Sequence, residues 1–238
     1  MTKTAYITGG SKGIGFGIAE ALLHKGINVA ITARTQSDLE VAEQQLKAIG
    51  KGEVLIIQSD ARSLASEESA VQQVIDKWGR LDYCIANAGV GKFSPIDKMS
   101  AEDWNLVIDV NLTGVFNTVK ASIPALKASK GYIITISSLA GTNFFEQGAA
   151  YNASKFGLVG FSQAIMLDLR RYDIKVSTIM PGSVATHFNG HQVTEKEAWK
   201  IQPEDIGQMV ADLVHLNPRT LPSKIEVRPS VPPSARNQ

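Results

Sequence analysis

Tyr151 and Lys155 are the residues of this chain whose types and spacing most directly suggest proton transfer. In a helix, side chains four positions apart share one face, and an ammonium beside a phenol favours loss of the phenol proton. Ser138, a short way upstream, could bring a hydroxyl to the same place. Taken alone, a Tyr and a Lys at this spacing are usually an ordinary pair on a helix surface. The elements around them must therefore show whether the three groups meet.

The elements that would position these groups alternate between strand and helix patterns. Apolar runs predict strands at 3–8, 28–33, 53–58, 81–86, 132–136, 175–179 and 224–227. Helical patterns predict one helix ending near Gly26 and others at about 37–49, 63–78, 101–128, 150–171 and 203–216, with a bend near Pro124 and a short helix in the loop 186–200. Because most strands are apolar on both faces, the chain predicts an α/β fold with a parallel sheet covered by helices on each side.

Unusual polar and glycine residues gather just after the predicted strands. In parallel sheets the ligand crevice lies beyond the carboxyl ends of the strands. The residues found there are the glycine loop 9–15, Arg34, Asp60, Asn87, Ser138 and Pro181. Two of these positions also have plainer explanations, since Asp60 could cap a helix and Asn87-Ala88-Gly89 could be a turn. The gathering of these residues at the carboxyl ends of the strands predicts one binding site at this edge of the sheet.

Gly9, Gly13 and Gly15 stand where the first predicted strand turns into a helix. Glycine lets the backbone approach a pyrophosphate, and the helix N-terminus presents unpaired N–H groups. The spacing differs from the usual G-x-G-x-x-G pattern, and glycines at such a turn could be purely structural. Together with the other crevice residues, the loop predicts a dinucleotide site.

The end of the second predicted strand carries Arg34 in place of an Asp or Glu that would bind a free ribose 2′-hydroxyl. A guanidinium suits a 2′-phosphate, and Lys12 in the glycine loop could add a second cation. The alternative is that both are ordinary solvated charges. The two residues predict NADP(H) rather than NAD(H).

The composition fits a single large domain spanning residues 1–238. The chain is 44% hydrophobic and has a formal net charge of +1. No global basic field would attract nucleic acid or an anionic membrane, so small-molecule partners are expected. Without a leader-like start or a membrane-length apolar run, we expect a soluble, cytoplasmic protein.

The cysteine and histidine content predicts no metal site. The single cysteine, Cys84, lies in an apolar run, which indicates a buried structural thiol and a reducing compartment. His187 and His191 lie in a lid expected at about 182–200, without a cysteine or acidic partner nearby. We interpret them as polar lid residues.

The ordered set of motifs resembles the short-chain dehydrogenase/reductase family, in its single-domain branch, over nearly the whole chain. The motifs are Thr8-Gly9-x-x-x-Gly13-Ile14-Gly15, Asp60, Asn87-Ala88-Gly89, Asn111, Ser138, Tyr151-x-x-x-Lys155, and Pro181-Gly182 followed by Thr186. The resemblance implies a Rossmann-like, doubly wound sheet of seven parallel strands and a catalytic tetrad of Asn111, Ser138, Tyr151 and Lys155. In that family the serine lies thirteen residues before the tyrosine, and this spacing selects Ser138 over its neighbour Ser137.

The resemblance also implies which residues hold the cofactor. Asp60 and Ala61 would contact adenine, and Thr186 would hold the nicotinamide carboxamide. Asn111 would anchor a water that connects Lys155 to solvent, although an Asn inside a helix could otherwise mark a kink or a surface position. The expected cofactor set is Gly9, Ser11, Lys12, Gly13, Ile14, Gly15, Arg34, Asp60, Ala61, Asn87, Ala88, Gly89, Tyr151, Lys155, Pro181, Gly182, Val184 and Thr186.

The chemistry of ketone reduction fits these residue types. Hydride arriving at the carbonyl carbon places negative charge on the oxygen, so a proton donor and a hydrogen-bond donor must meet there. Tyr151 would be the acid, and Ser138 would orient and polarise the carbonyl. A phenol ionises at about pH 10, so we expect Lys155 and the positive nicotinamide of the oxidised cofactor to lower its pKa. The predicted function is an NADPH-dependent carbonyl reductase or alcohol dehydrogenase acting on a small ketone or secondary alcohol.

The substrate pocket is expected in three loops, at 90–93, 139–147 and 182–191. Phe144, Phe145 and Phe188 would make it apolar, or could instead pack in the core or in a subunit contact. Relatives pair two long helices into tetramers, so a homo-oligomer, either a tetramer or a dimer, is expected.

Two alternative functions remain open at this stage. The first is a 3-oxoacyl-carrier-protein reductase. Those enzymes use arginines beside the active-site entrance, where this chain has Ser129 and Tyr172, with Lys127, Lys130, Arg170 and Arg171 nearby. The second is a catalytically idle NADP-sensing or scaffold protein on the same fold, against which the intact Ser138, Tyr151 and Lys155 argue.

Overall fold

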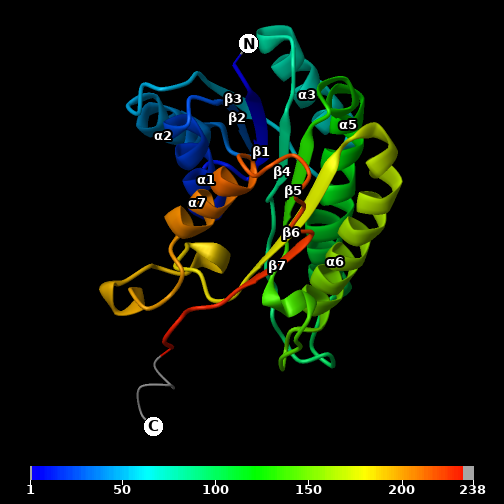
Figure 1. Ribbon diagram of the computed structural model, residues 1–238. Helices are drawn as coiled ribbons and strands as arrows, with labels where there is room; N and C mark the ends of the chain where they lie inside the picture. The colour runs from blue at the N-terminus through cyan, green and yellow to red at the C-terminus, as the bar shows by residue number, and fades with distance from the viewer. Residues whose placement is uncertain (1, 233–238) are drawn as a thin grey trace.

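Seven parallel strands form one sheet, in the order β3-β2-β1-β4-β5-β6-β7 (Figure 1). The computed structural model describes residues 2–232, and the strands in this range are β1 (Thr4–Thr8), β2 (Asn28–Ala33), β3 (Val54–Gln58), β4 (Tyr83–Ala86), β5 (Tyr132–Ile136), β6 (Lys175–Pro181) and β7 (Lys224–Val227). Every neighbouring pair is parallel. The predicted fold class is confirmed, and the strand ends differ from the prediction by no more than two residues.

Helices cover both faces of this sheet (Figure 1). One face packs against α1 (Gly13–His24), α2 (Gln36–Lys47) and α7 (Pro203–Leu213). The other packs against α3 (Leu64–Trp78), α5 (Gly114–Ser129) and α6 (Ala149–Leu169), with α4 (Ala101–Ile108) preceding α5. Among residues 2–232, no helix is both long and apolar enough to span a bilayer.

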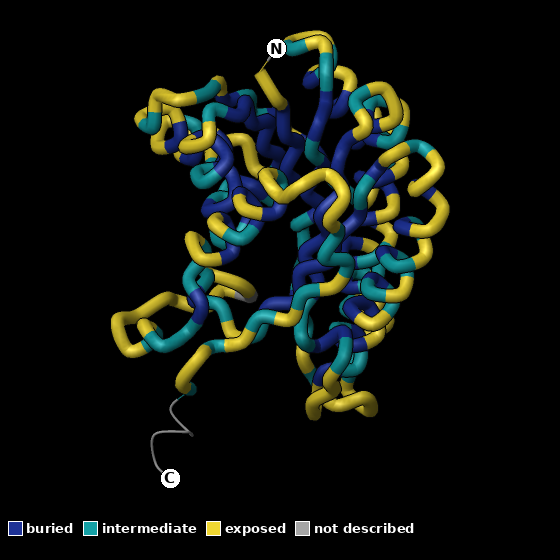
Figure 2. Tube along the Cα trace, in the orientation of Figure 1, coloured by how far each residue is buried: buried dark blue, intermediate teal, exposed yellow. Residues whose placement is uncertain are grey.

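Strand β1 shows how the sequence builds two cores. Successive side chains of a strand point to opposite faces, so Ala5 and Ile7 join the core under α1, α2 and α7, while Tyr6 joins the core under α3, α5 and α6. All five residues of β1 are buried, and the central strands form the buried interior of the molecule (Figure 2). This burial on both faces explains the continuous apolar runs.

The predicted helix 101–128 is interrupted by a π-helical turn at Asp109–Thr113. The interruption lies there and not at Pro124, which α5 accommodates inside its length. A π-turn inserts a residue into the helix and re-aims its side chains, a feature frequent at functional sites. Here the turn contains Asn111, whose side chain is fully buried.

The strand order places a crevice between β1 and β4. From β1 the chain proceeds outward through β2 to β3, and it then returns to the other side of β1 and proceeds through β4 to β7. The loops at the carboxyl ends of β1 and β4 therefore diverge, which is the geometry of a ligand site in doubly wound sheets.

The lid segment at 182–200 follows β6 and spans this crevice. The single short helix predicted there is replaced by two 3-10 turns, Phe188–Gly190 and Glu195–Glu197. Val184 and Ile201 form an isolated parallel bridge that closes the base of the segment, and the Ala185 N–H donates to the Ile201 carbonyl at 2.8 Å.

Candidate active site

A cavity of about 840 Å³ opens at the carboxyl ends of the strands. Eighteen of the residues expected at the site line it: Gly9, Ser11, Lys12, Gly13, Ile14, Arg34, Asp60, Ala61, Asn87, Ala88, Gly89, Ser138, Tyr151, Lys155, Pro181, Gly182, Val184 and Thr186. Gly15 and Asn111, the other two expected residues, are buried beside the cavity and do not line it. This volume lies toward the upper end of the range for ligand pockets, which suits an extended ligand.

The glycine loop brings the N-terminus of α1 to the cavity. The helix begins at Gly13, and the side chain of its N-cap residue, Lys12, caps no backbone N–H. The first N–H groups of a helix lack intrahelical partners, so they can bind an anion here. A Cβ added at Gly15 would lie 2.4 Å from the Gly9 carbonyl oxygen, and Gly9 itself has φ +66°. The glycines therefore permit a tight turn, with Gly15 serving the packing beneath the loop.

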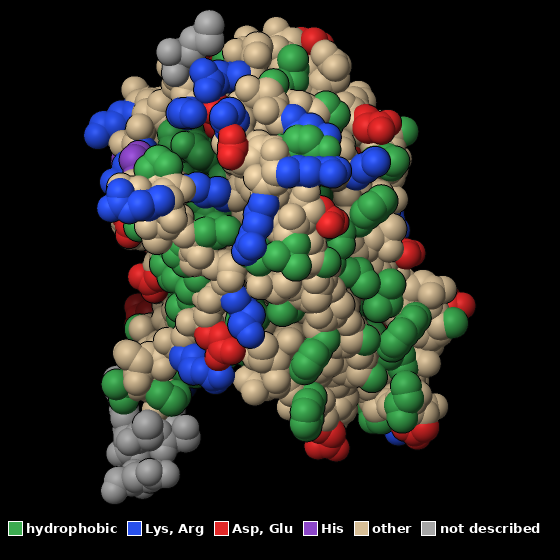
Figure 3. Space-filling view, turned by 45° about the vertical axis from the view of Figure 1, so that its right-hand side comes forward, with side chains coloured by type: hydrophobic (Ala, Val, Ile, Leu, Met, Phe, Trp, Pro, Cys, Tyr) green, Lys and Arg blue, Asp and Glu red, His purple; other side chains and the backbone are tan. Residues whose placement is uncertain are grey.

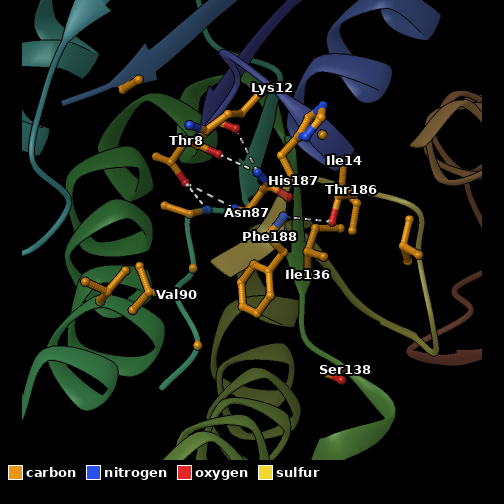
Figure 4. A pocket seen from close by; sticks show the side chains of 18 of the residues that line it. Thr8, Lys12, Ile14, Asn87, Val90, Ile136, Ser138, Thr186, His187 and Phe188 are labelled. Carbon is orange, nitrogen blue, oxygen red and sulfur yellow. Dashed lines mark hydrogen bonds between the residues drawn. The ribbon is translucent and has the colours of Figure 1, made fainter. Parts of the chain in front are cut away.

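Asn87 connects the ends of β1 and β4. Its side-chain amide donates to the carbonyls of Thr8 (2.9 Å) and Gly9 (3.1 Å). In return, the Thr8 hydroxyl accepts the backbone N–H groups of Asn87 and Ala88, each at 3.1 Å (Figure 4). Asn87 is thus more than a turn residue, since it sets the width of the crevice. The role of Thr8 was not predicted from the sequence, although a hydroxyl at the end of an apolar strand could have indicated it.

Two cations stand where the second strand and the glycine loop end. Arg34 and Lys12 are both exposed and line the cavity, so their charges face solvent that an anionic ligand could replace. Lys12 lies 3.7 Å from the carboxylate of Asp38, which also lines the cavity. Asp38 was not predicted as a site residue, because it lies in the first turn of α2 and not at the strand end.

Asp60 is held in place by Arg62 and does not cap a helix. The Arg62 guanidinium donates to the Asp60 carboxylate at 3.0 Å and, together with the charge of Arg34, lowers the pKa of that carboxyl. Ser63 caps α3 instead, accepting the Ser66 N–H at 3.2 Å. Asp60 therefore remains available at the cavity wall.

Ser137, Ser138 and Tyr151 all line the cavity, and Ser137 also supports the helix behind it. The buried Ser137 hydroxyl donates to the Lys155 carbonyl at 3.3 Å. The Ser138 hydroxyl accepts the Ala140 N–H at 3.1 Å and interacts with the phenol of Tyr151. The geometry thus favours Ser138 as the hydroxyl next to the phenol.

Lys155 and Tyr151 lie one helical turn apart in α6, with the Lys155 Nζ 5.7 Å from the centre of the Tyr151 ring. Lys155 is 5% exposed, and its Nζ donates to the Ile136 carbonyl at 3.1 Å. Burial lowers the pKa of Lys155 to about 8. In the protein without cofactor, burial raises the pKa of Tyr151 and the Ser138 hydroxyl opposes this effect. The lowering expected from Lys155 together with the oxidised nicotinamide stays a prediction.

Asn111 supports the cavity from below. Its Oδ1 accepts the Val90 N–H at 2.8 Å, and its Nδ2 donates to the Val90 carbonyl at 2.9 Å and to the Ser154 hydroxyl at 3.1 Å. A Cβ added at Gly89 would lie 3.4 Å from Asn111 Oδ1 and 3.8 Å from Lys155 Nζ. The π-turn therefore brings Asn111 close to the amine, beneath the loop that lines the crevice.

A family model described as short chain dehydrogenase matches residues 3–197. The chain belongs to this family. The family consists of oxidoreductases that act on CH–OH or C=O groups with a nicotinamide cofactor, and the lining of the cavity is consistent with that chemistry.

Individual relatives are similar to this dehydrogenase over much of its length. It is 38% identical to the 3-dehydrosphinganine reductase TSC10A of Arabidopsis thaliana over 218 residues, which are 90% of this chain and 66% of that protein. It is 36% identical to the 3-oxoacyl-[acyl-carrier-protein] reductase FabG of Escherichia coli over 185 residues, 77% of this chain and 74% of that protein. A solved metagenomic short-chain oxidoreductase in complex with NADP is 35% identical, with a TM-score of 0.85 over 97% of this chain and 98% of that chain.

The lid of this dehydrogenase lies across the glycine loop. A Cβ at Gly13 would lie 3.4 Å from the Thr186 methyl group, and the Thr186 hydroxyl accepts the Phe188 N–H at 3.4 Å. Thr186 and His187 thus lie beside Ile14 at the cavity, and the ring of Phe188 extends away from the glycine loop (Figure 4).

The prediction that the lid histidines lack an acidic partner is wrong for His191. Its Nε2 lies 2.8 Å from the Glu197 carboxylate, which also pairs with Lys200. These two partners lower the pKa of Glu197 to about 2. His187 instead contacts the His191 carbonyl through Nδ1 at 3.1 Å. The cluster holds the lid's two 3-10 turns together, a polar structural role.

The three phenylalanines predicted to line the substrate pocket have different surroundings in the structure. Phe144 is 86% exposed and belongs neither to the cavity lining nor to the core. Phe188 lines the cavity and Phe145 does not, but their ring centres lie 5.9 and 6.4 Å from that of Tyr151. Phe93, in the predicted loop 90–93, approaches the same ring at 5.5 Å.

Proposed function

We propose that this protein is an NADPH-dependent carbonyl reductase that interconverts a small ketone and its secondary alcohol. The observation that carries the proposal is the convergence of Ser138, Tyr151 and Lys155 in one cavity with a phosphate-binding glycine loop. Residues 1–238 would form one NADP-binding oxidoreductase domain. The cofactor would supply the hydride, and the side chains of this chain would orient the carbonyl and supply the proton.

Each side chain has a role that follows from its surroundings. Tyr151 would donate its phenol proton to the carbonyl oxygen, because burial keeps the phenol protonated at neutral pH. Ser138 would donate a hydrogen bond to the same oxygen as negative charge develops there. Lys155, with its pKa of about 8, would hold the nicotinamide ribose and restore the proton to Tyr151. Asn111 would fix the Val90 loop and anchor the water that relays this proton.

The choice of NADP(H) rests on Arg34 and Lys12. The two exposed cations line the same cavity, and a planar guanidinium matches a phosphate in two-pronged geometry. The metagenomic relative was solved with NADP. The carboxylate of Asp38 already pairs with Lys12, so the 2′-phosphate would compete with it for that lysine, and Arg34 would be the stronger determinant.

Replacement of Tyr151 tests the mechanism directly. Tyr151→Phe and Ser138→Ala should each lower kcat by at least ~100-fold in NADPH oxidation with a panel of ketones, the scale of lost acid catalysis. Tyr83→Phe, which alters a tyrosine that does not line the cavity, is the matched control. Full activity in Tyr151→Phe refutes the mechanism. Tight NADP binding without turnover of any carbonyl compound would favour an idle sensor.

Carrier-protein reduction is a second candidate, which the relative from Escherichia coli favours. The residues that stand where carrier-protein reductases have their entrance arginines argue against it. Ser129 is partly buried and donates to the Leu81 carbonyl at 2.6 Å, and Tyr172 lies under Lys127 at 3.8 Å. A 3-oxoacyl thioester reduced equally well on a carrier protein and on a short thiol would exclude recognition of the carrier.

The outer faces of α5 and α6 suit a homo-oligomer, either a tetramer or a dimer. Phe116, Phe156 and Leu167 are 44%, 43% and 59% exposed, and hydrophobic side chains are spread over this side of the molecule (Figure 3). Light scattering should give a mass of at least two chains, and Phe156→Glu should lower it, because a buried charge destabilises an apolar interface. A monomeric mass for the unmodified protein contradicts the proposed homo-oligomer.

The cytoplasm is the proposed compartment, since Cys84 is free and buried.

A further inference from the structure

Three phenylalanines from separate loops surround the ring of Tyr151. The ring centres of Phe93, Phe188 and Phe145 lie 5.5, 5.9 and 6.4 Å from that of Tyr151, at interplanar angles of 67°, 61° and 54°. Phe93 and Phe145 also contact each other at 5.8 Å. Phe93 and Phe188 meet the Tyr151 ring edge-to-face, and Phe145 meets it at a tilt, all within the distance range of favourable aromatic pairs. The arrangement, called here the aromatic slot, places three phenyl rings beside the proposed proton donor.

Glycines allow the rings to approach this closely. A Cβ at Gly91 would lie 2.7 Å from the ring of Phe188 and 2.9 Å from that of Phe93. A Cβ at Gly148 would lie 2.7 Å from the ring of Phe145. Each ring therefore packs against a glycine backbone, and a side chain at either glycine would displace the phenylalanine rings. The packing is a feature of this sequence and not a chance contact.

The slot is formed but not covered. Phe93, Phe145 and Phe188 are 41%, 48% and 38% exposed. Large aromatic side chains clustered in this state leave apolar area facing water, which a ligand can bury. A planar ring is the ligand shape that would stack against these faces and edges.

Two lysines that line the cavity are already paired with carboxylates. Lys92 lies 3.3 Å from the Asp103 carboxylate, and Lys200 pairs with Glu197. An anionic group on the substrate would have to compete with these carboxylates for a lysine, so the slot favours a neutral molecule.

We propose that the aromatic slot selects neutral aryl ketones, with the ring beside the carbonyl, and the corresponding benzylic alcohols. The inference rests on the carbonyl reductase function proposed above and names its substrate class. NADPH would give hydride to the carbonyl carbon and Tyr151 a proton to the oxygen, so the ketone is reduced to the alcohol and NADPH is oxidised to NADP⁺. The phenylalanines would position the ring and take no part in proton transfer.

A comparison of two ketones in four proteins tests the slot. Acetophenone and cyclohexyl methyl ketone have similar size, and the second lacks a π face. The ratio of their kcat/KM values should fall about three- to tenfold in Phe145→Leu and in Phe188→Leu, the range of one aromatic pair. Phe144→Leu, in the same loop but 86% exposed, is the matched control and should keep the ratio of the unmodified protein. Because the same two ketones are used in every protein, the difference in their intrinsic reactivity cancels when the ratios are compared between proteins.

Two further measurements separate the possible failures. NADPH binding, followed by fluorescence, should be unchanged in all three variants, which shows that they fold. 4-Acetylbenzoate, which adds a carboxylate to the ring, should have a kcat/KM at least tenfold below that of acetophenone, and an equal value overturns the preference for neutral substrates. Turnover of both ketones with an unchanged ratio in Phe145→Leu and Phe188→Leu overturns the slot alone. Absence of NADPH oxidation with all three ketones, while other ketones of the panel are reduced, overturns the slot alone. Absence with the whole panel overturns the proposed function and the slot with it.

Discussion

Replacing Lys155 with Met should make the cofactor-free protein more stable at pH 7. Lys155 is buried, and its pKa is lowered from 10.5 to about 8. At about 1.36 kcal/mol for each pH unit between the two values, keeping the ammonium charged in the folded protein costs about 3 kcal/mol at pH 7. The variant loses the hydrogen bond from Nζ to the Ile136 carbonyl, worth about 1 kcal/mol. Met fills a similar volume without a charge, so we expect a net gain of about 2 kcal/mol.

The dependence on pH identifies the cause of this gain. Below pH 8 the amine is protonated in both the folded and the unfolded protein, and the full cost is present. Between pH 8 and 10.5 the folded protein holds a neutral amine while the unfolded chain still binds the proton. The cost therefore shrinks as pH rises, to about 1 kcal/mol at pH 9.5 by the same linkage. The advantage of Lys155→Met should fall by about 2 kcal/mol from pH 7 to pH 9.5.

Urea denaturation of both proteins at the two pH values, without cofactor, measures this difference, because the other titrating groups cancel. Lys51→Met, at an exposed position, is the control and should change the free energy of unfolding by less than about 0.5 kcal/mol. The reasoning fails if Lys155→Met is less stable than the unmodified protein at pH 7, or if its advantage is the same at pH 9.5. Its kcat should fall at least ~100-fold, so the amine would be kept for chemistry at the expense of stability.

Two other substitutions test the cofactor end of the cavity and the core beneath it. Arg34→Asp should move the ratio of kcat/KM for NADPH over NADH at least tenfold toward NADH, since it removes a phosphate ligand and adds a ribose acceptor; an unmoved ratio excludes Arg34 as the determinant. Glu67 is fully buried, accepts hydrogen bonds from Tyr6, Ser59 and Thr118, and has its pKa raised by burial. A raised folded-state pKa means stability that is lost as pH rises, so the unfolding free energy of the unmodified protein, relative to Glu67→Gln, should decrease from pH 5 to pH 8 in urea denaturation. An increase over that range contradicts the role of burial.

Local patterns were sufficient to predict the sheet and the glycine loop. Strand β1 is buried on both faces, so its residues are apolar throughout and its boundaries are visible in the sequence. The glycine loop is likewise encoded locally, because the close approach of Gly15 to Gly9 leaves no room for a side chain. A strand followed by such a loop predicts a site without knowledge of any distant contact.

Contacts between distant segments were not predictable in the same way. Phe144 and Phe145 are neighbours of the same type, yet one is solvent-exposed and the other contacts Tyr151. What separates them is Gly148, which makes room for the Phe145 ring. Asn111 is buried because a π-turn re-aims it toward Val90, and no spacing rule predicts that turn.

The charge state of the Tyr151 and Lys155 pair shows why a motif does not fix its own chemistry. The sequence predicts that the ammonium lowers the phenol pKa, but the structure buries both groups, and burial disfavours the charged form of each. The phenol pKa is therefore raised while that of the amine is lowered to about 8. At neutral pH this keeps Tyr151 protonated, which is the form that carbonyl reduction consumes. The directions of these two pKa shifts thus follow from the depth of the cavity and not from the spacing of the two residues.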